Sequence, residues 1–328
     1  MPTRTVILGT GAYAPLKVLT NADLEQMVAT NGEWIVSRTG IRERHIAAEG
    51  EATSDLAAAA ARRALDLAGV TAQEIDAIIV ATVTGDTPTP ACAAHVQAKL
   101  GAANAFCFDV SAACAGSLYA LSIADQFIRN GTIKRALVIG AETLSRVVDW
   151  SNRETCVLFG DGAGAILLGA SEDEGRGVLA AKLRTDGAMT DILCIAGGGS
   201  RRPLSEDVLH DNAHKIQMRG KEVFKAASRL LPEIVRETLD LAGLTVADVD
   251  HVLAHQANLR IIEAAMDNLG IPIEKCWINI DRYGNTSSAS MPITLDEANR
   301  AGRLKKGDVI AMMAIGAGIT WGGAVLRW

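Results

Sequence analysis

The sequence has little of what defines several large classes of protein. Aromatic residues make up 4% of its 328 residues and charged residues only 21%, and 38 acidic against 32 basic residues give a net charge of −6. Nucleic acid is therefore not expected as a partner, because proteins that bind it usually carry a basic stripe. With 49% hydrophobic residues the chain is too apolar to be disordered, and it is long enough for one large α/β unit or two domains.

Cysteine pairs and unbroken apolar runs are also missing. The six cysteines contain no Cys-x-x-Cys spacing, a scatter typical of reduced thiols in a cytosolic protein. The longest uncharged stretch, 309–326, is broken by four glycines, which predicts two strands joined by a tight turn rather than a membrane span. We therefore expect a soluble, cytoplasmic protein that makes no membrane contact.

Two possible cofactor motifs are rejected on their context. The segment from Gly9 to Ala14 matches the dinucleotide-binding pattern G-x-G-x-x-A, but Pro15 follows and no helix opens there to face a pyrophosphate. His251 and His255 lie on one predicted strand, about 13 Å apart at ~3.3 Å per residue, which is too far to bind one metal ion. We therefore expect neither a nicotinamide cofactor nor a metal.

The chain repeats a helix–turn–strand pattern. Residues 65–81 (LDLAGVTAQEIDAIIVA) and 239–255 (LDLAGLTVADVDHVLAH) share seven identical positions at an offset of 174, and residues 131–134 parallel 302–305 at an offset of 171. Each long copy predicts a helix that ends at a glycine, then a turn and a buried strand. Two such units in the same order predict a duplicated α/β fold with residues 1–171 and 172–328 as its halves.

Cys114 lies where a predicted strand turns into a predicted helix. Residues 105–110 have the character of a strand, 111–116 are small turn residues, and 117–129 have apolar residues at helical spacing. The same strand–turn–helix arrangement presents the nucleophile in α/β-hydrolases, and a helix N-terminus favours the thiolate. We expect Cys114 to be a nucleophile with a lowered pKa, and the other cysteines to be structural.

His255 and Asn285 are the candidate partners of Cys114. His255 ends the predicted strand of the second copy, and open α/β sheets place their sites at the carboxyl ends of strands. Asn285 lies in a Gly-Asn-Thr turn before a helical stretch, and the 171 offset places it opposite Cys114. A pseudo-twofold axis would then bring both turns to one central site. The alternatives are an ordinary core histidine and an ordinary helix cap.

Three segments around these residues, 109–116 (DVSAACAG), 255–260 (HQANLR) and 283–287 (YGNTS), form a specific pattern. Three more segments extend it over nearly the whole chain: 33–45, 159–164 and 318–322. In these segments the chain resembles β-ketoacyl-acyl-carrier-protein synthase III, the initiating condensing enzyme of bacterial fatty-acid synthesis, within the thiolase superfamily. The resemblance implies a five-layer αβαβα fold of two similar halves, which agrees with the repeat.

The resemblance also implies a role for each candidate residue. Cys114 would take the acyl group from acyl-CoA, and His255 and Asn285 would stabilise the enolate formed when malonyl-acyl carrier protein loses CO2. The backbone amides of Cys114 and Ala317 would bind the tetrahedral oxyanion. Because acyl-CoA is a substrate, no resident cofactor is implied. Trp34 and Arg153 would sandwich the CoA adenine. The pantetheine arm would be lined by Thr30, Arg38, Phe224 and Asn258.

The implied partners are a carrier protein and a second copy of the chain. Lys225 and Arg260 would dock the acidic carrier, although acidic and neutral residues follow Arg260 where relatives can be basic. The alternative is therefore a thiolase-like acyltransferase of secondary metabolism that moves the acyl group to another acceptor. The family also implies a homodimer that covers residues 105–110. Thr89 falls where some relatives place a phenylalanine across the dimer, so we expect a deeper acyl pocket.

Overall fold

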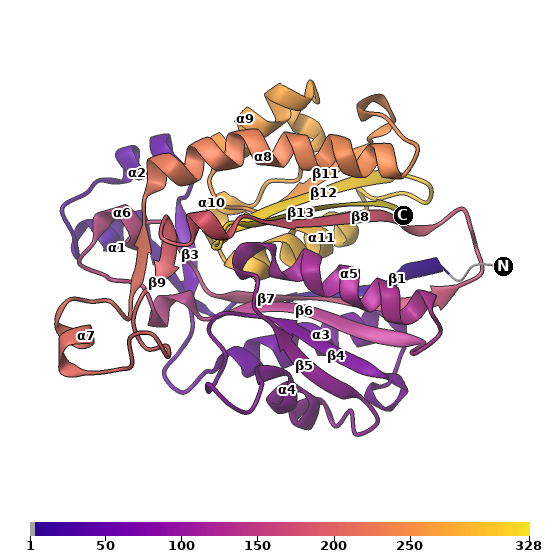
Figure 1. Ribbon diagram of the computed structural model, residues 1–328, viewed down its shortest axis with the longest axis horizontal. Coiled ribbons are helices and arrows are strands. Elements are labelled where there is room, and N and C mark those ends of the chain that lie inside the picture. The colour runs from indigo at the N-terminus through magenta and orange to yellow at the C-terminus, as the bar shows by residue number, and fades with distance from the viewer. Residues whose placement is uncertain (1–3) are drawn as a thin grey trace.

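The computed structural model describes residues 4–328 as two stacked β-sheets with helices between and around them (Figure 1). The first part of the chain contains β1 (Arg4–Tyr13), β2 (Lys17–Thr20), α1 (Asn21–Glu25), α2 (Gly32–Thr39), β3 (Glu43–Ile46), α3 (Thr53–Ala68), β4 (Ala77–Ala81), α4 (Cys92–Leu100), β5 (Phe106–Val110), α5 (Gly116–Arg129), β6 (Arg135–Glu142), α6 (Arg153–Cys156) and β7 (Gly162–Ser171). The second part contains β8 (Gly177–Thr185), β9 (Leu193–Ile195), α7 (Glu206–His210), β10 (Ile216–Met218), α8 (Gly220–Leu241), β11 (His251–Ala254), α9 (Leu259–Leu269), α10 (Ile280–Tyr283), α11 (Ser290–Arg300), β12 (Val309–Gly316) and β13 (Thr320–Arg327).

These elements form the five αβαβα layers that the family resemblance implied. The first sheet has the order β1-β7-β6-β4-β5 and the second the order β11-β12-β13-β8. Helices α3 and α4 cover the outer face of the first sheet and α8 and α9 that of the second, while α5 and α11 lie between the sheets (Figure 1). The central core contains side chains from both sheets and from α5, such as Ile79, Met312 and Leu118.

The two sheets repeat one topology. The first four strands of the first sheet have counterparts in the second: β1 corresponds to β8, β7 to β13, β6 to β12 and β4 to β11. Strand β5 has no counterpart among the described strands of the second sheet. The repeated glycines stand at the ends of α3 and α8 with positive φ, 64° at Gly69 and 69° at Gly243. Since β7 ends at Ser171 and β8 begins at Gly177, we propose that residues 1–171 and 172–328 are the two halves.

The offset between the two central turns is 174, so the expected equivalence of Asn285 with Cys114 is wrong. Two 3-10 helices, η2 (Ala113–Ala115) and η7 (Ser287–Ala289), lead directly into α5 and α11. The counterpart of Cys114 is therefore Ser288, and Asn285 lies three residues earlier. The offset falls to 171 only beyond these helices, because α11 has 11 residues and α5 has 14. The two turns nevertheless contact each other, as predicted.

The glycines of the rejected dinucleotide pattern serve helix packing. Both lie within β1, where a Cβ atom at Gly9 would stand 2.3 Å from the carbonyl oxygen of Ala64, and one at Gly11 would stand 2.2 Å from that of Ala60. Their lack of side chains therefore lets the alanine-rich helix α3 lie directly against the strand.

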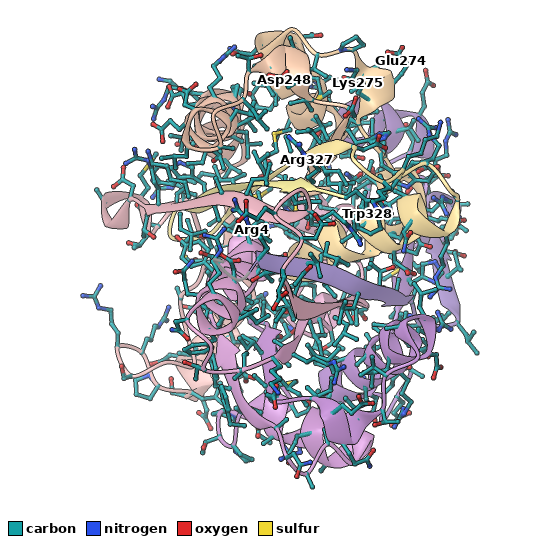
Figure 2. All side chains as sticks on the ribbon, turned by 90° about the vertical axis from the view of Figure 1, so that its right-hand side faces the viewer. Arg4, Asp248, Glu274, Lys275, Arg327 and Trp328 are labelled. Carbon is teal, nitrogen blue, oxygen red and sulfur yellow. The ribbon has the colours of Figure 1, made fainter. Side chains whose placement is uncertain are left out.

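The C-terminal stretch forms the two antiparallel strands that its glycines predicted, β12 and β13. None of the helices within residues 4–328 has the length and apolar character to cross a membrane. Arg4 and Trp328, the first and last described residues, lie on the same side of the molecule (Figure 2), and Trp328 packs against the central core.

A smaller hydrophobic cluster lies beside the layered core. It joins residues of α1, α2 and α6 with residues of β10 and of the segment that follows α6, including Leu24, Ile35, Ile216 and Phe159. Phe159 also lines the cavities around Cys114, so this cluster forms one wall of the candidate site.

Candidate active site

Cys114 lies at the strand–turn–helix junction that the sequence predicted. It is the middle residue of η2, between the end of β5 and the start of α5. The preceding residue, Ala113, has a φ of 45°, a left-handed conformation that side-chain-bearing residues rarely adopt and that costs about 1–3 kcal/mol. Helix α5 begins at Gly116, two residues after the cysteine, and η7 and β12 pack against η2 from the other half of the repeat.

The pKa of Cys114 differs from expectation. The neighbouring side chains on its own turn are small, but η7 and β12 enclose the turn and leave the residue only 7% exposed. Burial raises the pKa of the thiol to about 12, and a hydrogen bond from Ser287 acts in the opposite direction. Cys114 is therefore a thiol near neutral pH, and its activation requires a group that accepts its proton.

His255 lies directly after β11, at the carboxyl end of the strand. Its backbone amide donates to the carbonyl of Met313, and its ring nitrogen Nδ1 lies 2.7 Å from the Ser290 hydroxyl. Burial lowers the pKa of the imidazole to about 3, so the ring is neutral at physiological pH. The contact with Ser290 leaves Nε2 as the nitrogen available to the cavity.

Asn285 is held in one orientation by its backbone and its own side chain. Its amide N–H donates to the carbonyl of Leu158, and its carbonyl accepts from Gly160. The side-chain oxygen Oδ1 accepts a hydrogen bond of 2.8 Å from the backbone N–H of Ser287. This contact assigns the NH2 group to the other side of the amide plane, where it is available as a donor.

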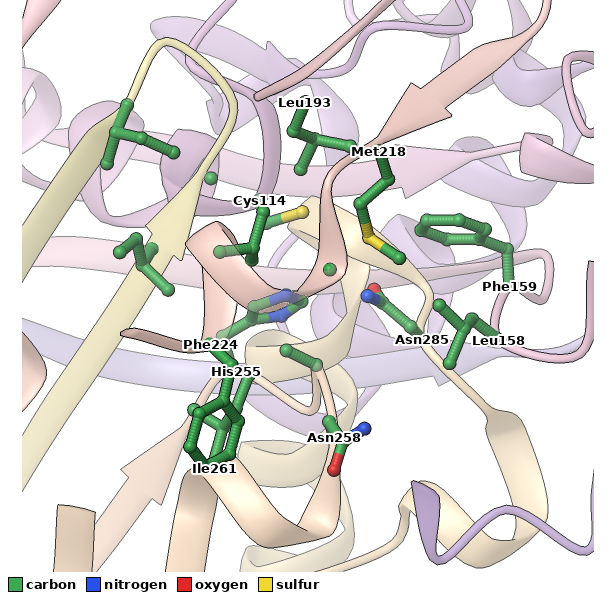
Figure 3. Close-up of a pocket in the computed structure, with 16 residues that line it drawn as sticks. Cys114, Leu158, Phe159, Leu193, Met218, Phe224, His255, Asn258, Ile261 and Asn285 are labelled. Atoms are coloured by element: carbon green, nitrogen blue, oxygen red, sulfur yellow. The ribbon is translucent and has the colours of Figure 1, made fainter. Parts of the chain in front are cut away.

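The three side chains meet at one buried cavity, which Figure 3 shows. Cys114 comes from the first half, and His255 and Asn285 come from two segments of the second half. The rest of the lining is mostly apolar, with Leu158, Met218, Phe224, Ile261 and Ile315 among its members. The site therefore combines a thiol nucleophile with two neutral N–H donors in a largely apolar setting.

Residues 108–187 match the family model described as 3-oxoacyl-[acyl-carrier-protein (ACP)] synthase III, and residues 239–328 match the model of its C-terminal part. A relative named β-ketoacyl-[acyl-carrier-protein] synthase III, from Caldanaerobacter subterraneus subsp. tengcongensis, is 52% identical over 98% of this chain and 97% of its own length. The chain belongs to the β-ketoacyl-acyl-carrier-protein synthase III family. The solved 3-oxoacyl-[acyl-carrier-protein] synthase III of Aquifex aeolicus shares its fold, with a TM-score of 0.92, 48% identity and coverage of 99% of this chain and 100% of that one.

A second synthase III-like structure bears on the alternative function. The priming β-ketosynthase of the R1128 polyketide pathway is 37% identical, with a TM-score of 0.91 over 100% of this chain and 98% of that one. The relatives' names thus favour a condensing synthase over an acyltransferase with another acceptor.

Two of the six residues assigned to CoA by resemblance to synthase III, Phe224 and Asn258, line the cavity with Cys114. Asn258 also caps α9 and donates a hydrogen bond of 3.0 Å to the carbonyl of Arg38 on α2, whose own side chain is exposed. The Thr30 hydroxyl is buried and has no hydrogen-bond partner among residues 4–328. Thr30 lines neither cavity that contains Cys114, and Asn258 and the Arg38 carbonyl already hold each other.

Trp34 and Arg153 lie outside the cavity and are stacked on each other. The guanidinium carbon of Arg153 is 4.4 Å from the centre of the Trp34 ring, and the same side chain donates to the carbonyl of Ala29. An adenine ring between them needs contacts of ~3.5 Å on each face, so the two side chains must separate to about 7 Å.

The other residues assigned from the synthase III resemblance lie at three different places. Lys225 and Arg260 are exposed, and the Arg260 guanidinium is 5.9 Å from the ring of Phe224 at the cavity. Ala317 lines a second cavity, which also contains Cys114. Thr89 is exposed and lines neither of these cavities in its own chain. A Cβ atom at Gly316 would stand 2.5 Å from the Cys114 amide nitrogen, so this glycine permits the close approach of β12.

Sequence reasoning missed three polar residues next to the site: Glu142, Ser287 and Ser290. Ser290 contacts His255, and Ser287 contacts both Asn285 and Cys114. Glu142 ends the apolar strand β6 and is fully buried. An acidic residue that closes a buried strand was a detectable signal, since sites in α/β folds gather at the carboxyl ends of strands.

Proposed function

We propose that this chain is an acyltransferase that condenses an acyl-CoA primer with malonyl-acyl carrier protein. The observation that carries the proposal is the convergence of Cys114, His255 and Asn285 on one buried cavity. First, the Cys114 sulfur attacks the thioester carbonyl and the bond to CoA sulfur breaks. Then the malonyl group loses CO2, and the resulting enolate carbon attacks the acyl-cysteine, which gives 3-ketoacyl-carrier protein and frees Cys114.

His255 and Asn285 suit the decarboxylation step because both are neutral donors. The negative charge of the enolate develops on the thioester oxygen, where two N–H groups stabilise it without surrendering a proton. His255 can serve in this way when the Ser290 hydroxyl turns its one hydrogen from the carbonyl of Ser287, 2.9 Å away, to Nδ1, which leaves the ring proton on Nε2. The backbone N–H of Ser287 donates to Oδ1 of Asn285, so the NH2 group of Asn285 is the end of the amide left to donate to the enolate. For the acylation step, we assign the oxyanion to the backbone amides of Cys114 and Ala317.

The two cavities that share Cys114 fit the two arms of a thioester. Phe224 and Asn258 line only the first cavity, which we assign to the pantetheine arm. We assign Thr30 and Arg38 to the same arm. The second cavity has an apolar lining that includes Leu144, Ile195 and Ile216, and we assign it to the acyl chain. Trp34 and Arg153 would hold the adenine after they separate. This assignment makes acyl-CoA a substrate, and the proposal includes no resident cofactor and no metal.

Lys225 and Arg260 place two positive charges beside Phe224, at the edge of the first cavity. An acidic carrier protein would be attracted to them, chiefly through a faster association that salt would reduce. A cytoplasmic location for the chain, with no contact to membrane or nucleic acid, completes the proposal.

The decisive experiment supplies acyl-CoA and malonyl-carrier protein together and measures CO2 release with the mass of the carrier-bound product. We expect one CO2 per 3-ketoacyl-carrier formed. Acylation of Cys114 without CO2 release would instead support the alternative, acyl transfer to another acceptor. A protein that fails to accept an acyl group at all would contradict both.

We also propose a homodimer formed through β5. This strand is an edge of the first sheet and pairs with β4 alone among the described strands. Phe106 on β5 is 45% exposed and stacks with Phe108. An exposed apolar edge strand invites pairing with another strand, and in sedimentation at micromolar concentration we expect the mass of two chains.

In such a dimer, Thr89 would contribute to the acyl pocket of the partner subunit. A threonine leaves more space than phenylalanine, and each extra methylene that becomes buried contributes about 0.8 kcal/mol, close to a fourfold preference. We expect butyryl- or octanoyl-CoA to acylate Cys114 at least as well as acetyl-CoA, and Thr89→Phe to shift the preference toward acetyl. Competition among the three CoA esters, read by protein mass, measures this; an acetyl adduct alone on the unmodified chain would contradict it.

A further inference from the structure

Glu142 is a buried acid that the proposed reaction does not yet use. Its side chain is fully buried at the end of β6. Within the described residues no Lys, Arg or His contacts it, and its contacts are hydroxyls and one backbone amide. Oxygen Oε2 accepts from Thr82, Val83 N–H and Thr84, and Oε1 lies 3.1 Å from the Ser287 hydroxyl and 3.2 Å from that of Ser288.

The hydrogen count around Oε1 indicates where a proton fits. The Ser288 hydroxyl has a single hydrogen, and it donates this to the carbonyl of Ala81 at 2.7 Å. The contact between Ser288 and Glu142 is then a hydrogen bond only when Glu142 itself carries a proton and donates it. Burial raises the pKa of Glu142 to about 7, against the lowering effect of the Thr84 and Ser287 bonds, so both protonation states are accessible near neutral pH.

Ser287 connects this acid to the nucleophile. Its hydroxyl lies 3.1 Å from Oε1 of Glu142 and also makes the hydrogen bond that lowers the pKa of the Cys114 thiol. One hydroxyl thus stands between a thiol that must lose a proton and a carboxylate that can accept one. The residues that contact Glu142 from the segment after β4 and from η7 have no titratable side chain. The titratable group near Glu142 on η2 is Cys114.

The duplication shows that the fold does not by itself require an acid here. At the 174 offset, Glu142 corresponds to Gly316 and Ser288 corresponds to Cys114. The strand end contacts the turn of the opposite half in both cases: Gly316 lies against the Cys114 amide, and Glu142 lies against the Ser288 hydroxyl. The second half closes the same strand end with a glycine, so the carboxylate is specific to the half that faces Ser287.

We propose that Glu142, acting through the Ser287 hydroxyl, holds the proton of Cys114 while the cysteine is acylated. This inference rests on the acylation of Cys114 in the proposed function. The S–H proton moves to Ser287 Oγ as the Ser287 proton moves to Oε1, which yields thiolate and carboxylic acid. The thiolate attacks the thioester, and the CoA thiolate takes its own proton from solvent. When condensation breaks the acyl–cysteine bond, the two protons move back and restore the thiol.

The test measures the rate at which iodoacetamide alkylates Cys114, from about pH 5.5 to about pH 9.5, with peptide mass mapping. In the unmodified chain we expect the rate to rise to a midpoint near pH 7 and then to level off for about one to two pH units, where thiol and carboxylate share one proton, before direct ionisation of the thiol raises it again. Glu142→Gln leaves the thiol to titrate alone, so its rate should keep rising about tenfold per pH unit. A merely structural role for Glu142 would lower the rate without removing the plateau.

Two serine variants separate the relay from the packing. Ser287→Ala breaks the connection but keeps Glu142, and should lose the plateau as Glu142→Gln does. Ser288→Ala removes a neighbouring contact of Glu142 outside the connection, and should keep the plateau. If Glu142→Gln does not fold, Ser287→Ala decides alone. A plateau that survives in Ser287→Ala overturns the proposal.

Acylation by acyl-CoA near neutral pH gives a second readout. A positioned general base typically contributes 10²–10⁴ in rate, so Glu142→Gln and Ser287→Ala should each slow acylation by on the order of 10²-fold. Wild-type acylation rates in both variants overturn the relay but leave the proposed function intact. If the unmodified chain is alkylated at Cys114 but never acylated, the proposed function is wrong. The pH profile of alkylation still tests the proton transfer through Ser287 in that case.

Discussion

Replacing Cys114 with alanine is expected to abolish the covalent acyl-enzyme. Cys114 lines both cavities, and its backbone amide is one of the two assigned oxyanion donors, the other being that of Ala317. No serine or threonine lies within η2 to substitute for it, since η2 consists of Ala113, Cys114 and Ala115. Incubation with acyl-CoA followed by intact-protein mass should show one acyl adduct on the unmodified chain and none on Cys114→Ala.

Cys276 provides a matched control for this experiment. It is 7% exposed, as Cys114 is, and burial raises the pKa of both thiols to about 12. It lies outside both cavities that contain Cys114. Cys276→Ala should therefore keep the full adduct. An adduct that persists in Cys114→Ala, or disappears in Cys276→Ala, would assign the nucleophile wrongly.

Local patterns in the sequence were sufficient for the duplicated helix–strand units and for the position of Cys114, whereas the five layers were implied by the family resemblance. The Leu-Asp-Leu-Ala-Gly repeats mark helix ends followed by strands, and they recur at the same places in both sheets. Likewise, the small residues from Ser111 to Gly116 have one common use, a tight turn between a strand and a helix. Both signals depend on neighbours within about ten residues, which the sequence itself provides.

What the sequence could not provide depends on contacts between the halves. Cys114 has small neighbours along the chain, so its pKa was expected to be low, yet β12 and η7 bury it from more than 170 residues away. The offset at the turns was misjudged for a related reason. A helix three residues shorter in the second half shifts the downstream repeat without shifting the turn. Ser287 and Glu142 stand 145 residues apart and meet only in the folded chain.

Alanine at His255 or Asn285 is expected to lose condensation while keeping acylation. Each side chain supplies one N–H donor to the enolate oxygen, and removal of one such donor typically costs about 10²–10³ in rate. The acyl-enzyme should still form, because its oxyanion is assigned to backbone amides that these substitutions leave in place. Pre-acylated protein mixed with malonyl-carrier protein, with CO2 followed over a single turnover, isolates the affected step.

His251→Ala is the control for the histidine variant. His251 begins the same strand that His255 follows, and its Nε2 contacts Asp308 at 3.0 Å, outside the cavity. It should condense at the wild-type rate. If His255→Ala also condensed malonyl-carrier protein at that rate, the assigned role of the imidazole would be wrong.

The pH dependence of the same step tests the charge of His255. Burial holds its pKa at about 3, below the ordinary value of 6.5, so the ring stays neutral until the pH falls well below 5. A neutral ring donates from Nε2 in the same way throughout, and the single-turnover rate of CO2 release from pre-acylated protein should therefore stay level from about pH 8 down to about pH 5. A protonated ring would offer the enolate a cationic donor, which is stronger but readily gives up its proton. A rate that changes with a midpoint near 6.5 in Glu142→Gln as well, where the other group that titrates near neutral pH is removed, would show that the imidazole titrates as it does in water and that the cavity does not keep it neutral.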